Sequence, residues 1–417
     1  MYLQILLTLL SLPNPTTPQS FSLIGDSNPT SSSLNFWFTT TPIPTTTTTT
    51  PSQSYTALQS FKSSITSDPT NLLSSWVGPN LCSYNGIFCS STQTILSIDL
   101  NRAHLKGHLH PSLSLLHPSL SLLHLNSNSF SGDIPTSFSS LTYLTELDLS
   151  NNNLSGPFPT HLLSLPKLLY LDLRFNSFSG PLPFELFQTQ IDAIFLNNNH
   201  FEGSLPISLW SSSASVINLA NNHLSGPIPM TFAASPAIKE LLFLNNNLTG
   251  CVPEGIGYLS DIQVLDLSFN SLTGRLPSMV SCLSGIEVLN VGHNRLSGVL
   301  PDIVCELKRL ENLTVAYNFF SGFSGECGRL GYRNVGFDFE GNCMEGKDLQ
   351  RPMVECVGVG ESGLSCFRIP SARNVMCGGG GGGPPSLYER AGIADTKFKV
   401  SLGGLALKEW LDRLFSY

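Results

Sequence analysis

The residues of this 417-residue chain best suited to covalent chemistry are its cysteines and the asparagines of its glycosylation sequons. Ten cysteines are present, and Cys82 and Cys89 are separated by six residues, a good span for a local disulfide. Asn153, Asn247 and Asn312 each begin an Asn-x-Ser/Thr sequon. Disulfides and N-linked glycans both form in the secretory pathway. These residues therefore predict a secreted protein in an oxidising compartment.

Sequence patterns for catalysis, metal binding and cofactor binding are weak by comparison. Gly358 to Gly363 follows the G-x-G-x-x-G spacing, but no strand pattern precedes it and no helix pattern follows it. Five histidines lie between His104 and His124, but no carboxylate or thiol shares a ligand pattern with them. No nucleophile elbow, Cys-x-x-Cys pair or distinct carboxylate pair is present. We therefore expect no enzyme activity, no cofactor and no metal site.

A repeat of 23 to 25 residues must position any functional side chain of this protein. The pattern L-x-L-x-x-N-x-L-x-G-x-Φ-P, with Φ apolar, occurs at Leu147–Pro159 and returns through the middle of the chain. Its glycine recurs at Gly107, Gly132, Gly156, Gly180, Gly203, Gly226, Gly250, Gly274, Gly298 and Gly322. A period of this length with this signature indicates a leucine-rich-repeat solenoid, an α/β fold of about ten repeats.

Each residue type in the repeat has a structural role. The L-x-L leucines alternate as a short strand, and stacked strands bury one face in a continuous core beneath a concave parallel sheet. An asparagine follows each strand, where a buried amide can bond the backbone groups that the bend leaves unpaired. The glycine permits a turn, and the proline stiffens the convex side. The asparagines are Asn128, Asn152, Asn176, Asn199, Asn222, Asn246, Asn270, Asn294 and Asn318, with Ala103 in the first repeat.

The segments outside the repeats define the remaining organisation. Residues 1–21 contain an apolar segment that predicts a signal peptide, although no Lys or Arg precedes it. Residues 22–53 form a Ser/Thr/Pro-rich linker. Residues 54–91 form an amino-terminal cap with a helix that includes Ala57, Leu58, Phe61 and Ile65. The repeats occupy residues 92–324 and stop after Gly322. Residues 325–377 form a cysteine-rich carboxyl-terminal cap, and residues 378–417 form a glycine-rich break and tail.

The repeat also suggests a second disulfide. Cys282 lies eight residues after Gly274, and Cys305 lies seven residues after Gly298, so the two cysteines occupy nearly the same position in adjacent repeats. Adjacent strands lie about 4.8 Å apart. A disulfide between Cys282 and Cys305 is therefore expected, in addition to that between Cys82 and Cys89.

The outward positions of the concave sheet are the expected binding site, because they have no packing duty. Acids outnumber bases there, and aromatic residues stand where small polar residues would serve a purely structural repeat. Aromatic anchors within a charged surround are typical of an interface hot spot. The alternative is that the aromatic residues only cover the strand edge. The candidate binding residues are Glu146, Asp148, Tyr170, Asp172, Arg174, Phe175, Phe195, Glu240, Asp266, Phe269 and Tyr317.

Charge limits the class of partner. The net charge of −8 disfavours nucleic acid and favours a basic partner. No apolar run after residue 20 is long enough to span a membrane. A glycan on Asn312 would lie on the concave face and cover its carboxyl-terminal third, so the ligand is expected over repeats three to eight if Asn312 is glycosylated.

The repeat region resembles the amino-terminal part of the plant leucine-rich-repeat extensins. The resemblance covers roughly residues 54–377, and the Gly-x-Φ-Pro ending resembles the plant-specific repeat class. It rests on strings such as Tyr170–Asn176, Leu248–Pro253, Asn312–Gly322 and Phe337–Cys343. The resemblance implies a secreted cell-wall protein whose repeats bind basic, cysteine-rich rapid-alkalinisation peptides. The Ser-Pro-rich extensin region of that family is not found after Cys377.

Three functions agree with these features. The first is peptide binding in cell-wall formation and signalling, with cell-wall polymers as a further class of partner. The second is inhibition of a wall-degrading enzyme, since the chain also resembles polygalacturonase-inhibiting proteins of about ten repeats. The third is a structural wall glycoprotein without a soluble ligand. The five cysteines of the carboxyl-terminal cap favour the first.

Overall fold

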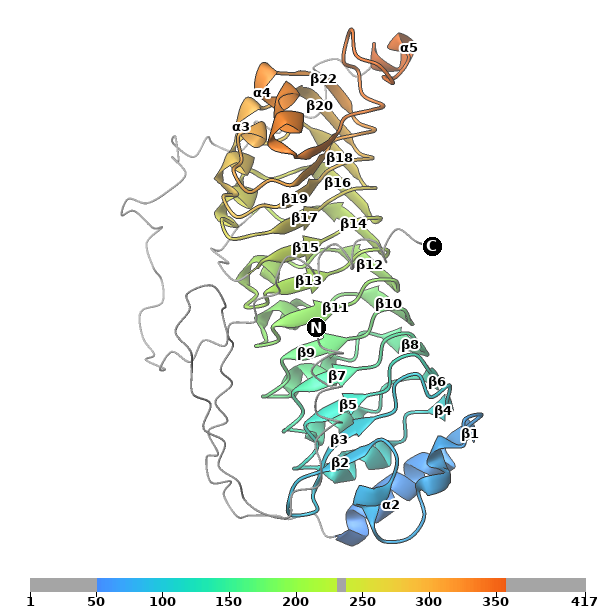
Figure 1. Cartoon of the computed structure of the whole chain (residues 1–417). Helices are drawn as coiled ribbons and strands as arrows, with labels where there is room; N and C mark the ends of the chain where they lie inside the picture. The colour runs from blue at the N-terminus through green and yellow to red at the C-terminus, as the bar shows by residue number, and fades with distance from the viewer. Residues whose placement is uncertain (1–50, 231–237, 358–417) are drawn as a thin grey trace, which may run out of the picture. The chain divides into compact units, whose positions relative to one another are not determined.

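The computed structural model describes residues 51–230 and 238–357 (Figure 1). Within these residues the repeats stack as a solenoid, as the period predicts, and each turn contributes one strand to each of two sheets. The first sheet has twelve strands, and all its pairs are parallel except β2 with β3. Its strands are β2 (Ile87–Cys89), β3 (Ile95–Asp99), β5 (Leu122–His124), β7 (Glu146–Asp148), β9 (Tyr170–Asp172), β11 (Ala193–Phe195), β13 (Val216–Asn218), β15 (Glu240–Leu242), β17 (Val264–Asp266), β19 (Val288–Asn290), β21 (Asn312–Thr314) and β23 (Gly336–Asp338).

The L-x-L pattern places one side of the first sheet in the core. Leu147 is aligned with Leu123 on one side and with Leu171 on the other. All three side chains are fully buried, and the second leucine of each pair, such as Leu149, is buried as well. Because a strand alternates its side chains, the residues between them face outward. We call this outward side the concave face.

A second sheet of eleven strands is the main difference from the expected single sheet. It arises because the N-x-L-x-G segments also lie one turn apart, so their free backbone groups pair in the same parallel way. Its strands are β1 (Ile65–Ser67), β4 (Lys106–His108), β6 (Ser129–Gly132), β8 (Asn153–Pro157), β10 (Ser177–Pro181), β12 (His200–Ser204), β14 (His223–Pro227), β16 (Asn247–Cys251), β18 (Ser271–Gly274), β20 (Arg295–Leu300) and β22 (Phe319–Phe323).

The Gly-x-Φ-Pro ending returns the chain to the first sheet. The glycine has positive φ in eight repeats, from Gly132 to Gly298, a conformation that favours glycine. In most repeats the proline then precedes a short 3-10 helix, where its missing N–H costs no hydrogen bond. These helices are η3 (Pro111–Leu116), η4 (Thr136–Ser140), η5 (Thr160–Ser164), η6 (Phe184–Gln188), η7 (Ile207–Ser211), η8 (Glu254–Tyr258) and η9 (Ser278–Cys282), with α3 (Asp302–Cys305) at the same place in the last full repeat.

The asparagine amides bond backbone groups of two successive turns, as expected. The Asn222 Oδ1 accepts a hydrogen bond of 3.0 Å from the backbone N–H of Phe201 in the preceding turn. Its Nδ2 donates to the carbonyl of Leu196, also in the preceding turn, and to the carbonyls of Leu219 and Ala220 in its own turn. The same set of bonds recurs from Asn128 to Asn318.

The amino-terminal cap covers the first turn. Helix α2 (Pro51–Ser63) buries Ala57, Leu58 and Phe61, whereas Ile65 lies in β1 rather than in the helix. The helix begins at Pro51, three residues before the expected start of the cap at residue 54. Two 3-10 turns follow, η1 (Leu72–Ser75) and η2 (Leu81–Ser83). The Cys82–Cys89 disulfide is confirmed, with Cα atoms 5.8 Å apart.

The repeat does not stop after Gly322. Strand β23 pairs in parallel with β21, and Asn342 makes the same bonds as the other asparagines, to Phe320 N–H and to the Val315 carbonyl. This further turn has the string Phe337-Asp-Phe-Glu-Gly-Asn342, in which phenylalanines replace the leucines. The prediction was wrong because this turn has no Gly-x-Φ-Pro ending.

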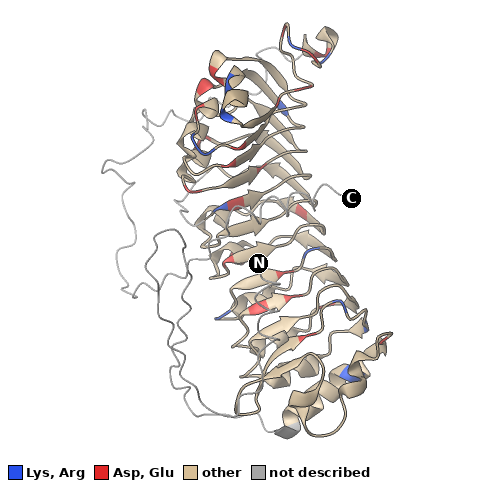
Figure 2. Ribbon diagram, viewed as in Figure 1, with Lys and Arg blue, Asp and Glu red and all other residues tan. Residues whose placement is uncertain are grey.

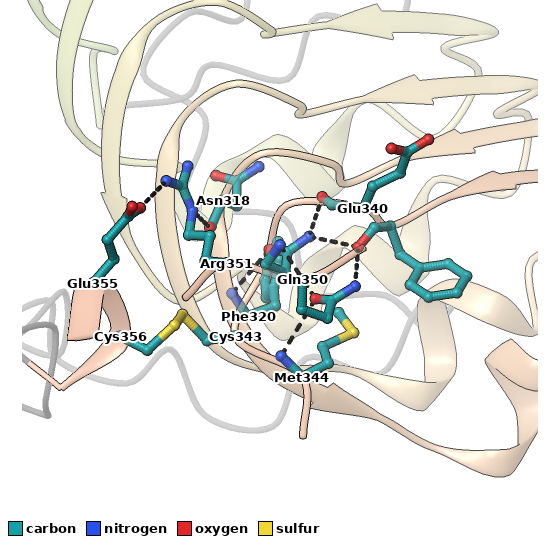
Figure 3. Close-up of a disulfide and its surroundings, with 11 residues drawn as sticks. Asn318, Phe320, Glu340, Cys343, Met344, Gln350, Arg351, Glu355 and Cys356 are labelled. Carbon is teal, nitrogen blue, oxygen red and sulfur yellow. Dashed lines mark hydrogen bonds and ion pairs between the residues drawn. A yellow bond between two sulfur atoms is a disulfide. The ribbon is translucent and has the colours of Figure 1, made fainter. Parts of the chain in front are cut away.

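The carboxyl-terminal cap closes over this further turn. It contains α4 (Gly325–Gly328), η10 (Leu330–Arg333) and α5 (Met353–Cys356). The Cys343–Cys356 disulfide holds α5, and Gln350 and Arg351 bond the backbone of Asn342 and Asn318 (Figure 3). The cap is thus attached through polar contacts as well as the disulfide.

The predicted disulfide between Cys282 and Cys305 is wrong. Cys305 is bonded to Cys327, with Cα atoms 4.9 Å apart, and Cys282 is also disulfide-bonded. Equal position along the repeat was not sufficient, because Cys282 ends a 3-10 helix whereas Cys305 ends an α-helix. Cys327, the partner of Cys305, lies in α4 of the cap, which packs against α3.

Several predictions lie outside the described residues: the signal peptide, most of the linker, the tail, and the cysteines Cys366 and Cys377. None of the helices in residues 51–230 and 238–357 is long and apolar enough to cross a membrane.

The asparagine bonds predict a large stability cost for one small substitution. Replacing Asn222 by Ala would leave the buried Phe201 N–H and the carbonyl groups of two turns without their partner. We expect a loss of about 2–4 kcal/mol in the free energy of unfolding, measured by chemical denaturation.

Asn80→Ala is the matched control, because Asn80 is exposed and its side chain makes no capping hydrogen bond. A cost for Asn222→Ala no larger than that of the control would contradict this account of the repeat.

Candidate functional site

The strand register places the outward side chains of the concave face in two columns. The first column contains the first residue of most strands: Ser97, Leu122, Glu146, Tyr170, Ala193, Val216, Glu240, Val264, Val288, Asn312 and Gly336. The second column contains Asp99, His124, Asp148, Asp172, Phe195, Asn218, Leu242, Asp266, Asn290, Thr314 and Asp338. Seven of the eleven candidate residues lie in these columns. Arg174, Phe175, Phe269 and Tyr317 lie in the bends that follow the strands.

The amino-terminal part of the concave face contains a histidine–carboxylate pair. The His124 Nε2 lies 3.1 Å from the Glu146 Oε2 on the next strand. Burial opposes the charge of His124, but the hydrogen bond and charge of Glu146, together with Asp148 and Asp99, raise the histidine pKa. Asp148 accepts hydrogen bonds from the backbone N–H and hydroxyl of Ser150. The sequence analysis did not include His124 among the candidate binding residues.

Asp172 lies at the centre of a network rather than on the open surface. The Tyr170 hydroxyl donates to its Oδ2 at 3.1 Å, and the Arg174 Nε lies 3.0 Å from the same oxygen. The Arg174 guanidinium also lies over the Phe195 ring. The Asp172 side chain is fully buried. Burial raises the pKa of Asp172 to about 7, with help from Asp148 and against the charge of Arg174.

Asp266 is a second candidate that does not project freely. Its Oδ1 accepts from the backbone N–H and the hydroxyl of Ser268, and its Oδ2 accepts from the Asn290 amide. Burial raises the pKa of Asp266 although these hydrogen bonds lower it. Asp172 and Asp266 were expected to have no packing duty, but neighbouring side chains cover both carboxylates.

Three glutamates crowd one edge of the concave face. Burial raises the pKa of Glu240, and the charge of Glu287 raises it further while Lys239 lowers it. Burial likewise raises the pKa of Glu287, and the charge of Glu311 adds to this effect. The negative charge of Glu287 thus acts on Glu240, and that of Glu311 acts on Glu287. Figure 2 shows acidic residues along the first sheet with few Lys or Arg beside them.

A column of residues with left-handed backbone carries the exposed aromatic rings. The residue before each repeat asparagine has positive φ, and in several repeats it is itself an asparagine, such as Asn221. Phe175, Phe269 and Tyr317 occupy the same position with φ of 53°, 53° and 55°. Bulky residues rarely adopt this conformation, and such strain often marks functional positions. These three side chains are 42–48% exposed.

His293 completes a stack that the sequence analysis missed. Its ring lies 4.0 Å from the Phe269 ring and 4.3 Å from the Tyr317 ring, nearly parallel to both. Burial and the charge of Arg351 lower the pKa of His293, although Asp338 opposes them. A spacing of 24 residues on either side of His293 was the available signal. Phe175 lies four turns from this stack.

The three sequons lie on different faces. Asn153 and Asn247 begin strands β8 and β16 of the second sheet, and both are exposed. Asn312 begins β21 and is exposed on the concave face, as the sequence analysis expected.

Together these residues define the chemistry of the concave face. The concave face offers acids and exposed aromatic rings on a rigid parallel sheet, which suits a basic partner with apolar side chains. Among the described residues, no group of three or more His, Cys, Asp or Glu side chains could hold a metal ion.

The buried Asp172 predicts how stability depends on pH. Its pKa is about 7 in the folded protein against an ordinary value of 3.8, so folding favours the protonated form. The resulting contribution is fully present below the ordinary pKa and is lost as the pH rises to 7. The free energy of unfolding of the native protein minus that of Asp172→Asn should therefore fall by about 2–4 kcal/mol between pH 4 and pH 7.5.

Denaturation at several pH values measures this difference. The Phe184→Leu variant exchanges one exposed apolar side chain for another, so its difference from the native protein should not change with pH. A difference for Asp172→Asn that is also constant with pH would contradict the raised pKa.

Parts of this chain are similar in sequence to known protein families and to individual plant proteins. Residues 51–90 match the model of the leucine rich repeat N-terminal domain, and residues 118–178, 261–283 and 285–307 match leucine rich repeat models. Leucine-rich repeat extensin-like protein 2 of Arabidopsis thaliana is 58% identical over 152 residues, which are 35% of this chain and 19% of that protein. Extensin-like protein 4 of the same plant is 52% identical over 151 residues, which are 35% of this chain and 30% of that protein. The match therefore spans less than a third of either relative.

Solved structures share the fold at lower identity. The PEPR1–AtPEP1 crystal structure has a TM-score of 0.60 at 27% identity and covers 69% of this chain and 45% of that chain. The ectodomain of the Arabidopsis receptor kinase HAESA, in complex with an IDA peptide hormone, has a TM-score of 0.56 at 28% identity and covers 70% and 53%. A plant ice-binding protein has a TM-score of 0.60 at 27% identity and covers 70% and 94%. The described region is thus a leucine-rich-repeat solenoid, and a 152-residue part of the chain is homologous to a plant leucine-rich repeat extensin-like protein.

Proposed function

We propose that this protein is secreted to the plant cell wall and binds a basic, cysteine-rich signalling peptide through its concave face. The observation that carries the proposal is the gathering of acids there: beyond the effect of burial, the charge of Glu287 raises the pKa of Glu240, and the charge of Glu311 raises the pKa of Glu287. Carboxylates held together at this cost gain most from a cationic partner. The concave face is therefore a binding surface, and we assign the protein no catalytic role.

The relatives support both parts of the proposal. The extensin-like names of the homologues, together with the disulfides of both caps, support an extracellular protein of the wall. The HAESA ectodomain and the plant peptide hormone receptor RGFR1 were solved with peptide ligands on a similar solenoid. Binding of a peptide is therefore favoured over a purely structural role in wall organisation.

The distribution of groups on the concave face suggests how the peptide binds. Charges act over long distances and steer the encounter, whereas buried aromatic contacts slow the separation of the complex. Phe269, His293 and Tyr317 are held rigidly by stacking, so they lose little freedom when a partner covers them. We therefore assign the acids to association and the aromatic stack to the lifetime of the complex.

Neutralising the glutamates should slow association. The variant Glu240→Gln/Glu287→Gln/Glu311→Gln removes three negative charges from the concave face. Its association rate with a basic, disulfide-bonded peptide should fall about tenfold at low salt, with a weaker salt dependence. Surface plasmon resonance at several salt concentrations measures both quantities.

The control Asp133→Asn/Glu185→Gln/Glu202→Gln removes the same charge from exposed residues away from the concave face. Equal effects of the two variants would contradict a concave site. Polygalacturonase inhibition measured in parallel tests the alternative function, and strong inhibition without peptide binding would favour it.

Removing one aromatic ring should instead shorten the lifetime of the complex. Phe269→Ser introduces a residue that another repeat carries at this position, Ser127, so the backbone conformation is retained. The dissociation rate should rise by a factor corresponding to about 1–3 kcal/mol, with little change in the association rate.

Phe184→Ser is the matched control, because Phe184 is also about half exposed but lies on η6, away from the concave face. An unchanged dissociation rate for Phe269→Ser would show that the aromatic stack is not part of the binding site.

A further inference from the structure

A pocket lies at the carboxyl-terminal end of the first sheet, and none of the candidate binding residues lines it. It has a volume of about 610 Å³ and is formed by β23 and the loop before α5. The lining residues are Phe337, Asp338, Phe339, Glu340, Gly346, Lys347, Asp348 and Leu349. Asp338 belongs to the second column of the concave face, so the pocket continues that face.

Aromatic rings form one wall of this pocket. Phe337 aligns with Leu313, and every other turn from Ile98 onward has leucine or isoleucine at this position. The Phe337 and Phe339 rings lie 5.0 Å apart, and both meet Phe323 edge to face at 5.3 and 5.1 Å. All three are only partly buried. The final turn therefore exposes aromatic surface where other turns present aliphatic side chains to the next repeat.

The ammonium group of Lys347 already contacts this aromatic cluster. The Lys347 Nζ lies 4.9 Å from the centre of the Phe323 ring, a cation–π contact. The arrangement of the rings therefore suits a positive charge.

The charges around the pocket favour a further cation. Asp338, Glu340 and Asp348 line it against Lys347 alone, so three negative charges face one positive charge. None of the three acids forms an ion pair with another described residue. Figure 3 shows the Glu340 carboxylate pointing away from the hydrogen bonds of Gln350. All three acids are exposed, so their carboxylates are accessible to a bound cation.

We propose that this pocket binds an arginine side chain of the basic partner. The inference rests on the proposed function and adds the type of residue recognised and its place. A guanidinium is planar, is weakly hydrated, stacks on aromatic rings and bonds carboxylates with two parallel hydrogen bonds. An ammonium is more strongly hydrated and gains less from the rings. The pocket therefore selects arginine over lysine.

The test compares short peptides of equal length. Acetylated, amidated and fluorescently labelled tetra-arginine, tetra-lysine and tetra-citrulline are titrated with the full chain at low salt, and binding is followed by fluorescence anisotropy. Citrulline has the shape of arginine without its charge. We expect tetra-arginine to bind roughly three- to tenfold more tightly than tetra-lysine, and tetra-citrulline not to bind.

The variant Phe337→Leu/Phe339→Val removes the rings and restores the residues of the preceding turn, Leu313 and Val315. Because these residues pack in that turn, the variant is designed to fold, which circular dichroism verifies. It should lose the preference for arginine while retaining part of the charge-dependent binding. The variant Asp338→Asn/Glu340→Gln/Asp348→Asn should weaken both cationic peptides more than the control Asp133→Asn/Glu185→Gln/Glu202→Gln.

The outcomes separate this inference from the proposed function. Equal binding of tetra-arginine and tetra-lysine to the native protein overturns the arginine pocket. An unchanged preference in Phe337→Leu/Phe339→Val does the same, and then the rings only close the end of the core. If binding of a basic, disulfide-bonded peptide still depends on Glu240, Glu287 and Glu311, the proposed function stands without the pocket. If that peptide does not bind the native protein, both fail.

Discussion

The side-chain amides of the repeat asparagines are the interaction on which the rest of the structure depends. Each turn leaves the first sheet through a sharp bend, and a bend in the interior leaves N–H and C=O groups without partners. One amide, such as that of Asn222, satisfies groups of its own turn and of the turn before it. The same side chain therefore closes the bend and sets the stacking of neighbouring turns. Every column of the concave face inherits its alignment from this contact.

This alignment has an electrostatic cost, which we interpret as the basis of recognition. Strands stacked in register bring Glu287 and Glu311, which hold the same position in adjacent turns, close together, and the charge of Glu311 adds to the burial that raises the pKa of Glu287. A monomer selected for stability alone would alternate charges along such an edge. The same register brings Phe269, His293 and Tyr317 into van der Waals contact, which offsets the strain of their left-handed backbone. The scaffold is rigid, so both sets of side chains are organised before a ligand arrives.

The last turn shows how a solenoid changes where its repetition ends. Asn342 retains the bonding of the ladder, while Phe337 and Phe339 replace the aliphatic residues that a following turn would cover. Two features then close this end, the Cys343–Cys356 disulfide and the segment around Gln350 and Arg351. The aromatic rings remain partly open beside Asp338, which connects the closing structure to the concave face.

The sequence by itself determined the repeat, because the features that define it are local and recur in every turn. The L-x-L leucines, the asparagine and the glycine each act within a few residues or on the adjacent turn, so their spacing was sufficient to predict the solenoid and the positions of most concave residues. The short Cys82–Cys89 disulfide was predictable for the same reason.

Only the tertiary structure decided which of these residues are accessible and which partners they meet. Strand alternation predicts the face of Asp172 but not its burial, which depends on the side chains of Tyr170 and Arg174 meeting over it. The partner of Cys305 is Cys327 in α4, a cap helix that packs against α3, and the position of Cys305 in the repeat does not reveal this contact. The second sheet and the stacked ring of His293 likewise require that neighbouring turns already lie in register. These features are contacts between turns, and their geometry exists only once the turns have stacked.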